Sequence, residues 1–479
     1  MNSYEALLFE LSHLIFLINL FRMKNIFFLL TMLFLSPALF AQESLNVELL
    51  DNWNNPDYPP NGSGDKYNET WGFVHEGEEY GVIGSVEGIS IFRITEDDQL
   101  EFIQFVEGAE TQGVVHRDYH DYAGYLYAVC DQGASTLQIM DLSYLPDSVE
   151  VVYDSNDLIT RTHNIFIDTA TAKMYACGHI SSMTVFSLED PTAPDFLYIH
   201  NRYVHDAYVR NDTAFLNSGE DGLFIYDFSD MENPLLLGNI EFYEDKGYNH
   251  SGWLSEDGNT YVFADELPNG MRMKVCDVSN LPNIEIISFF HADMDDDPFS
   301  TPHNLMIRNN HVYVSHYIDG LQIFDISDTE NPVKAGYYET YPHEIDPDDH
   351  EWVEHFNGAW GVYALLPSGR ILVSDMTYGL FLLKFSDIFT TVENHHEPNG
   401  IKVFPNPASE YVELEFEENE SFQDKYLYVF NMNGQLVHEQ HVQDKRTRVN
   451  VQSYNSGAYF YSIFDRQSQQ TKSGKFIVH

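Results

Sequence analysis

The feature that most constrains this chain is an internal repeat. Seven segments each open with His or Trp and run through an apolar strand to a shared signature, of which Leu321-Gln-Ile-Phe-Asp325 is typical. The openings are 42 to 57 residues apart, at Trp71, His116, His163, His205, His250, His303 and Trp360. A repeat of this length is one supersecondary unit that cannot bury its apolar face alone, so neighbouring copies must pack against one another.

Each copy has room for four short strands, because alternating runs rich in Tyr, Phe, Ile and Val are separated by Gly, Asn, Asp and Pro. We therefore predict an all-β protein: a seven-bladed β-propeller, with six or eight blades as alternatives, followed by a small C-terminal β-sandwich. The last copy lacks an obvious fourth strand, and we expect Leu45 to Leu50 to complete it. A β-solenoid, the alternative fold, needs a shorter and stricter repeat.

The composition shifts along the chain predict four segments. Residues 1–41 have the plan of a signal peptide, since the basic stub Arg22 to Lys24 precedes an apolar run from Ile26 to Phe40 and the small residue Ala41. We expect translation to start at Met23 and cleavage to follow Ala41. A pair of membrane helices is the alternative, but both apolar runs are short for a bilayer. We assign residues 42–388 to the propeller, 389–399 to a polar linker and 400–479 to the sandwich. The mature chain is expected to have no transmembrane segment.

The charge of the chain limits its partners. It has 24 Lys and Arg against 75 Asp and Glu, a formal net charge of −51. A nucleic acid needs a basic face, so nucleic acid is excluded as a partner. The three cysteines are an odd number in a long chain, and we expect them to be buried small hydrophobic residues rather than a disulfide framework.

Four motifs near the C-terminus carry a family resemblance. They are Val403-Phe-Pro-Asn-Pro407, Val429-Phe-Asn-Met-Asn-Gly434, Ser456-Gly-Ala-Tyr459 and Gly474-Lys-Phe-Ile-Val478. The segment resembles the C-terminal sorting domain of the type IX secretion system of Bacteroidota. The resemblance implies passage through the periplasm, export by the type IX secretion machinery, and a final place in the medium or on the outer cell surface. It leaves open whether the module is cleaved or replaced by a surface anchor.

The repeat carries a second resemblance, through Trp71-Gly72, Glu79-Tyr-Gly81, His205-Asp206 and Leu321 to Ser327. Residues 45–387 resemble the LVIVD-repeat, choice-of-anchor B proteins. This resemblance implies a propeller-like array displayed outside the cell and brings no settled activity with it.

The opening residues are the candidate ligand-binding residues, because the first strand of each propeller blade lines the central channel. Trp71, the five histidines and Trp360 should then form one ring. His116, His163, His205, His250 and His303 could offer several imidazoles to a Zn-like transition metal, with Asp206 as an acceptor behind them. The alternative is structural: each His bridges neighbouring blades by hydrogen bonds.

Two acidic clusters offer a different metal chemistry. Asp293, Asp295 and Asp297 could hold calcium on a loop, and a second cluster runs from Asp346 to Glu351. Neither has EF-hand spacing, so a solvated acidic loop is the alternative.

No catalytic signature is present: the chain lacks Gly-x-Ser-x-Gly, a phosphate-binding loop and His-Glu-x-x-His. We therefore predict an exported propeller that binds an extracellular ligand, either glycan or protein. The alternative is a metal-dependent hydrolase or oxidoreductase that uses the channel histidines.

Overall fold

The computed structural model describes residues 43–179, 182–292, 301–341, 356–386, 401–416, 425–431, 436–455, 457–465 and 470–478. The chain divides into two compact units, Met1–Ser386 and Asp387–His479. Every regular element of the described residues is a strand, so the all-β prediction is confirmed. Within the same residues we find no helix long and apolar enough to cross a bilayer. The expected signal peptide and linker lie outside the described residues.

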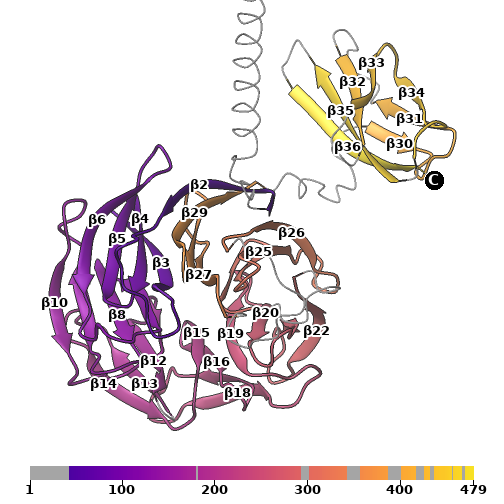
Figure 1. The fold of residues 1–479 in the computed structure, drawn as a ribbon. Helices are drawn as coiled ribbons and strands as arrows, with labels where there is room; N and C mark the ends of the chain where they lie inside the picture. The colour runs from indigo at the N-terminus through magenta and orange to yellow at the C-terminus, as the bar shows by residue number, and fades with distance from the viewer. Residues whose placement is uncertain are drawn as a thin grey trace, which may run out of the picture. The chain divides into compact units, whose positions relative to one another are not determined.

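In the part of the first unit that the structure describes there are seven antiparallel sheets, which follow one another along the chain (Figure 1). The first four are β3 (Tyr67–His75), β4 (Glu78–Ser85), β5 (Gly88–Ile94), β6 (Leu100–Glu107); β7 (Arg117–Tyr122), β8 (Tyr125–Cys130), β9 (Leu137–Asp141), β10 (Glu150–Ser155); β11 (Asn164–Asp168), β12 (Lys173–His179), β13 (Ser182–Ser187), β14 (Asp195–His200); and β15 (Asp206–Arg210), β16 (Thr213–Asn217), β17 (Leu223–Asp227), β18 (Leu235–Ile240). The last three are β19 (Asn249–Leu254), β20 (Thr260–Asp265), β21 (Met273–Asp277), β22 (Glu285–Phe290); β23 (Leu305–Arg308), β24 (His311–Ser315), β25 (Leu321–Asp325), β26 (Val333–Tyr338), with β1 (Ser44–Leu45) at its edge; and β27 (Ala359–Tyr363), β28 (Arg370–Asp375), β29 (Gly379–Phe385), β2 (Val47–Trp53).

The shared signature forms the third strand of every sheet, and its chemistry explains how that strand ends. In β9, β17, β21 and β25 the last residue is Asp, whose side chain accepts a hydrogen bond from the backbone N–H two residues on. An Asp that caps its own following turn in this way ends the strand and reverses the chain. The pairing of the third with the fourth strand shifts register in each of the seven sheets, so the copies share a β-bulge as well as a sequence.

The fourth strand of the last sheet comes from the start of the chain. β2 pairs antiparallel with β29, from Val47 opposite Phe385 to Trp53 opposite Leu380. The prediction that this region completes the last copy is confirmed for residues 47–50. It is wrong for Leu45, which belongs to β1 and pairs with Tyr337 of β26. The change of partner occurs at Asn46, whose φ of 55° turns the backbone out of the strand conformation.

The seven first strands are neighbours in a closed order. β3 lies against β7, β7 against β11, and so on through β15, β19, β23 and β27, and β27 lies against β3. Apolar side chains of consecutive sheets share the core between them; one such cluster joins Val129 and Ile139 of the second sheet to Ile165 and Met174 of the third. The residues at the start of the first strands are therefore brought toward one another.

The described residues of the second unit form two sheets around one core. β30 (Ile401–Phe404), β31 (Tyr411–Phe416) and β34 (Arg446–Asn450) form one sheet, and β33 (Leu436–His441), β32 (Lys425–Phe430), β35 (Gly457–Asp465) and β36 (Gln470–Val478) form the other. Both sheets contribute to a single apolar cluster, which includes Leu414, Leu427 and Phe476. The sequence patterns located β31, β32, β34 and β35 but missed β30, β33 and β36, which have more polar faces.

Candidate histidine site in the first unit

Six aromatic rings meet where the first strands begin, and we call them the histidine ring. Its successive members have ring centroids 4.0, 4.3, 4.3, 4.5 and 4.5 Å apart, and a distance of 5.6 Å between the last and the first closes the circle. The members, in order, are His116, His163, His205, His250, His303 and Trp360. The predicted meeting of the five histidines is thus present, and they come from five consecutive sheets.

Trp71 is not a member of this ring, although the repeat alignment placed it there. Its indole packs against the tilted ring of His120 and edge-to-face with Tyr363, at centroid distances of 4.5 and 4.8 Å, and its Nε1 donates to Asp121. The reason is the greater length of β3, which starts at Tyr67 and carries a register shift before Thr70. Sequence alone does not distinguish the first residue of a strand from a residue a few positions later. The two nevertheless lie at different positions along the central axis of the first strands.

The histidines are held from outside the ring by polar partners. Asp131 Oδ2 lies 2.8 Å from His163 Nδ1, and the carbonyl oxygen of Trp360 lies 2.6 Å from His303 Nδ1. The hydroxyl of Tyr203 lies 3.1 Å from His205 Nδ1. The first two contacts join neighbouring sheets, so the structural role predicted as the alternative is real for two of the five histidines. Both hydrogen bonds use Nδ1, so the Nε2 atoms of His163 and His303 are not engaged by them and could bind a ligand.

Three members of the ring have a buried nitrogen that lacks a hydrogen-bond partner among the described residues. These atoms are His116 Nδ1, His205 Nε2 and His250 Nδ1, on side chains no more than 8% exposed. Buried polar atoms in native proteins are nearly always paired, and an unpaired one calls for an explanation such as an ion. The three nitrogens are therefore the first sign of a ligand at this site.

Burial sets the protonation of the ring. It lowers the pKa of His303 to about 3, and burial together with neighbouring imidazoles holds the pKa values of His116, His205 and His250 well below their usual range. His163 differs: burial acts to lower its pKa, but the hydrogen bond to Asp131 and the charges of nearby carboxylates raise it overall. Four of the five imidazoles are therefore neutral at pH 7, the form in which His binds metals.

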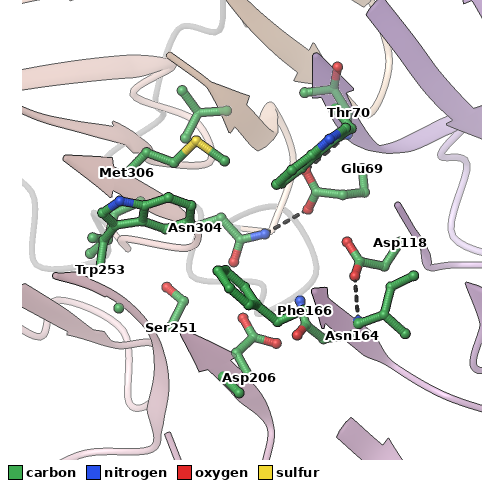
Figure 2. Close-up of a pocket in the computed structure, with 16 residues that line it drawn as sticks. Glu69, Thr70, Asp118, Asn164, Phe166, Asp206, Ser251, Trp253, Asn304 and Met306 are labelled. Carbon is green, nitrogen blue, oxygen red and sulfur yellow. Dashed lines mark hydrogen bonds between the residues drawn. The ribbon is translucent and has the colours of Figure 1, made fainter. Parts of the chain in front are cut away.

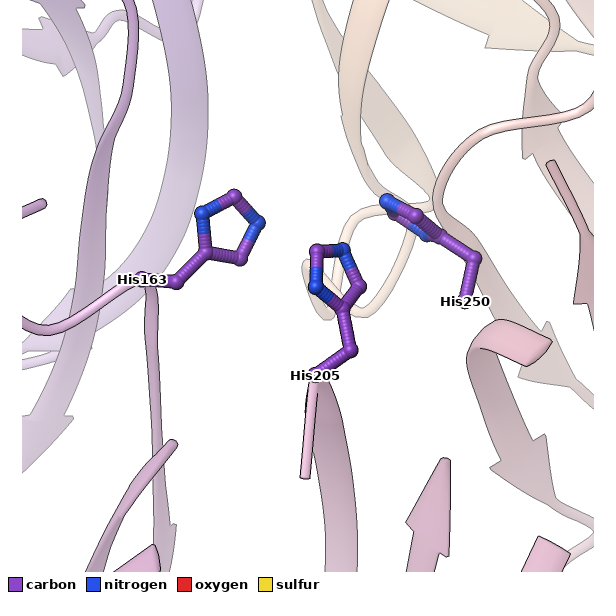
Figure 3. A group of neighbouring side chains, drawn as sticks. All are labelled: His163, His205 and His250. Atoms are coloured by element: carbon purple, nitrogen blue, oxygen red, sulfur yellow. The ribbon is translucent and has the colours of Figure 1, made fainter. Parts of the chain in front are cut away.

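Among the residues that the structure describes, potential metal-ligand atoms come together in three overlapping groups. In each group the atoms lie within 4.8 Å of one another, and the groups are His163, His205 and His250; His116, Asp131 and His163; and His250, Glu266 and His303. Figure 3 shows the imidazoles of the first group pointing into one space from three neighbouring sheets. Glu266 is fixed there by the Tyr317 hydroxyl, which donates to its Oε1 at 2.6 Å.

A layer of polar side chains follows the histidine ring, and sequence reasoning did not single it out as a site. We call it the polar layer: Glu69, Asp118, Asn164, Asp206, Ser251 and Asn304. Four of the six residues directly follow a ring histidine in the sequence, and Asp118 lies two residues after His116. A polar residue follows each ring histidine in the sequence, and this pattern could have indicated the layer. It was not recognised because the type of polar side chain differs from copy to copy.

The carboxyl groups of the polar layer are buried. Burial raises the pKa of Asp118 to about 8 and that of Asp206 to about 7, and it raises the pKa of Glu69 well above the usual range. Asp206 was expected to accept a hydrogen bond behind the histidines. Its closest approach to an imidazole is instead 4.0 Å, from Oδ2 to His250 Nδ1, which is too long for a hydrogen bond.

The polar layer encloses one side of a cavity of about 60 Å³ to which all seven first strands or their starts contribute (Figure 2). Two residues further along the strands lies an aromatic layer that includes Trp71, Phe166 and Trp253, with Phe166 and Trp253 centroids 6.0 Å apart. Alternate residues of a strand point to the same side, which is why the polar and aromatic layers succeed one another.

The remaining predicted site residues cannot be placed. Asp293, Asp295 and Asp297, the candidate calcium loop, lie outside the described residues, as does the second acidic cluster.

Comparison with protein families identifies the C-terminal module. Residues 402–479 match the model described as the secretion system C-terminal sorting domain. The predicted type IX sorting domain is therefore confirmed, and the protein is delivered by the type IX machinery, through the periplasm, to the medium or the outer cell surface. The comparison with curated proteins found no match.

Among solved structures, the chain is similar to PorZ, described as an essential bacterial surface component of the type-IX secretion system of Porphyromonas gingivalis. The two are 11% identical with a TM-score of 0.45, and the alignment covers 89% of this chain. It covers 61% of PorZ, so this chain spans less than two thirds of that protein.

Proposed function

We propose that this protein is an exported metal-binding propeller: its seven sheets are the blades of a closed ring, and the histidine ring at their centre binds one divalent transition metal ion. The observation that carries the proposal is the group of His163, His205 and His250, whose ligand atoms lie within 4.8 Å of one another. Three imidazoles are a common protein ligand set for zinc.

The electrostatics of the ring support metal binding. Neutral imidazoles have a free lone pair, and the lowered pKa values of His205 and His250 keep them neutral at physiological pH. Asp131 orients His163 from behind, as the carboxylate partners of metal-binding histidines do. Metal–nitrogen bonds of about 2.0 Å bring ligand atoms to within about 3.3 Å of one another, so binding requires small rotations of the three side chains.

The size of the cavity decides what else this centre can hold. Pockets for sugars and other drug-sized molecules occupy about 300–1,000 Å³, whereas the cavity beside the histidine ring measures about 60 Å³. A metal ion and a few waters fit there and a glycan does not. The extracellular glycan or protein ligand predicted from the sequence is therefore not expected in this cavity, and we place metal binding ahead of catalysis at the centre.

The test is metal analysis of the purified full chain. Zinc added in excess and then removed from solution should leave about one ion per chain, and Co²⁺ in its place should give the visible spectrum of a site with nitrogen ligands. His205→Gln should weaken zinc binding by about 100-fold or more, since it removes a direct ligand. Asp131→Asn should weaken it by about 10-fold, the usual effect of losing a partner behind a ligand.

His75 supplies the matched control, because it lies on β3 away from the ring. His75→Gln should bind zinc as the wild type does. Absence of stoichiometric metal in the wild type, or equal zinc affinity in His205→Gln and wild type, would contradict the proposal. Circular dichroism of each variant shows whether a loss of binding reflects a loss of fold.

A further inference from the structure

We propose that the polar layer is a second cation site of different chemistry, which binds one partly hydrated hard divalent ion of the Ca²⁺ class through oxygen ligands. The inference does not depend on the histidine ring binding a metal, because it rests on other side chains. It also differs from the predicted calcium loop, which lies elsewhere in the chain.

The atoms of the polar layer that could bind a metal ion are all oxygens. Glu69, Asp118 and Asp206 supply carboxylates from three different first strands, and Asn164 and Asn304 supply amide carbonyl oxygens. Figure 2 shows these five side chains gathered around the cavity. Carboxylates, amide oxygens and water are the ligands that Ca²⁺ takes in proteins, whereas the softer transition metals prefer the imidazoles of the neighbouring ring.

Several of these oxygens have nothing to bind in the protein itself. The Asp206 side chain is 12% exposed, and among the described residues no donor lies within hydrogen-bond distance of its carboxylate. The Oδ1 atoms of Asn164 and Asn304 are also buried without a partner. Buried acceptors without donors destabilise a fold. A cation satisfies a carboxylate and amide oxygens at once.

The charge of the cavity points the same way. Three acidic side chains line it, and among the described residues that line it none is Lys, Arg or His. His163, in the adjacent histidine ring, is the basic group that acts on Asp118 and Asp206. One imidazolium does not balance three buried carboxylates, so the cluster is unfavourable unless it is protonated or a cation neutralises it. Three carboxylates carry a charge of −3 when ionised, so one divalent ion still leaves the layer at −1. That remaining charge also tolerates a second cation in the adjacent ring.

The layer is organised to hold these groups in place. Asn304 Nδ2 donates to Glu69 Oε2 at 2.6 Å, and the N–H of Thr70 donates to Glu69 Oε1 at 2.9 Å. The seventh sheet has Gly361 where the others have a side chain, and a Cβ there would lie 1.7 Å from Glu69 Oε1. Gly361 thus leaves the space that the longer Glu69 side chain fills.

The volume of the cavity fits a hydrated ion. A cavity needs about 10–15 Å³ of space to hold one water, so about 60 Å³ accommodates an ion with a few waters. Carboxylates that do not reach the ion directly are then bridged to it by these waters, as is usual at hard-cation sites.

Terbium luminescence tests the proposal with the full chain. Tb³⁺ replaces Ca²⁺ at oxygen sites and emits when a nearby tryptophan is excited, and Trp71 and Trp253 line this same cavity. We expect a tryptophan-sensitised signal that saturates at one ion per chain and is displaced by Ca²⁺. Asp206→Asn, which keeps the shape of the side chain and removes its charge, should weaken this binding by about 10-fold or more.

The control is Asp195→Asn, which removes an acid that is exposed on β14 and should leave the signal unchanged. Glu69→Gln is a second variant, in case Asp206→Asn does not fold. The proposal would be overturned if the wild type gave no sensitised signal. It would also be overturned if folded Asp206→Asn and folded Glu69→Gln both bound Tb³⁺ as tightly as the wild type does. Its failure is separable from that of the zinc site: His205→Gln should lose zinc and keep the terbium signal, and Asp206→Asn should do the reverse.

Discussion

His200 shows at the scale of one residue how burial couples the fold to pH. It lies at the end of β14, is 7% exposed, and packs edge-on against Tyr226 and Phe228. Burial, with a smaller effect of Arg202, lowers its pKa to about 4. The unfolded chain takes up a proton at this residue below about pH 6.5, whereas the folded chain resists until about pH 4. His200 therefore costs the fold stability as the pH falls through this window.

His200→Phe should remove that cost. Between pH 7 and pH 4.5 the wild type should lose about 2 kcal/mol of unfolding free energy through His200 alone, and the variant should lose that much less. Urea denaturation at the two pH values measures the difference. His75→Phe, at a half-exposed position on β3, is the control and should keep the wild-type loss. An equal loss in His200→Phe and wild type would show that His200 does not titrate as described.

Single residues also show where the sequence was sufficient and where it was not. The signature located all seven third strands because its apolar alternation is repeated and local, and four of the seven copies also end in Asp. The five ring histidines could be predicted for the same reason. Trp71 was misplaced because a strand has a period of two and a bulge shifts the register, so a few residues of misalignment move a side chain to another layer. Asp206, Asn164 and Ser251 share a position but not a chemistry, which only coordinates reveal.

At the scale of elements, β2 joins the two ends of the first unit. It is hydrogen-bonded to β29, and its last residue, Trp53, packs against Phe92 of the first sheet at a centroid distance of 4.8 Å and against Tyr67 at 5.9 Å. The same strand thus pairs with the last sheet and packs onto the first. Asp51 adds a polar contact across this junction, accepting from the N–H of Leu100 at 2.8 Å.

Trp53→Ala should weaken this junction. Removing a large aromatic side chain from a core costs about 3–5 kcal/mol, and Trp53 is only partly buried, so we expect a loss of about 2–3 kcal/mol in the free energy of unfolding. Chemical denaturation followed by circular dichroism measures it. Phe242, which is 89% exposed, provides the control, and Phe242→Ala should change the stability by less than about 0.5 kcal/mol. A similarly small loss for Trp53→Ala would show that β2 contributes little.

At the scale of the whole molecule, the two units have different roles. Residues 402–479 match a sorting domain and carry the information for export, while the histidine ring and the polar layer lie in the first unit. This division was predictable from sequence because a sorting module is recognised by short motifs. The metal chemistry was only partly predictable, because it depends on which residues of seven distant segments come to one depth.

Deletion of residues 400–479 should leave the first unit in the periplasm of the native host. Cell fractionation and protease treatment of intact cells should find the truncated chain protected and the full chain accessible. Residues 400–479 fused to an unrelated periplasmic protein should carry that protein out of the cell. Normal surface delivery of the truncated chain would contradict the assignment of the module.

The pairing of β2 with β29 also governs the order of folding. The ribosome makes Val47 more than three hundred residues before its partner Phe385, so the last sheet stays incomplete until nearly the whole first unit exists. An open row of repeats can begin at any copy and fray from its free ends. In this chain β2, one of the first strands made, is paired with β29, the last strand of the first unit, so no repeat at either end is left without a neighbour. We expect the first unit to fold and unfold in a single cooperative step.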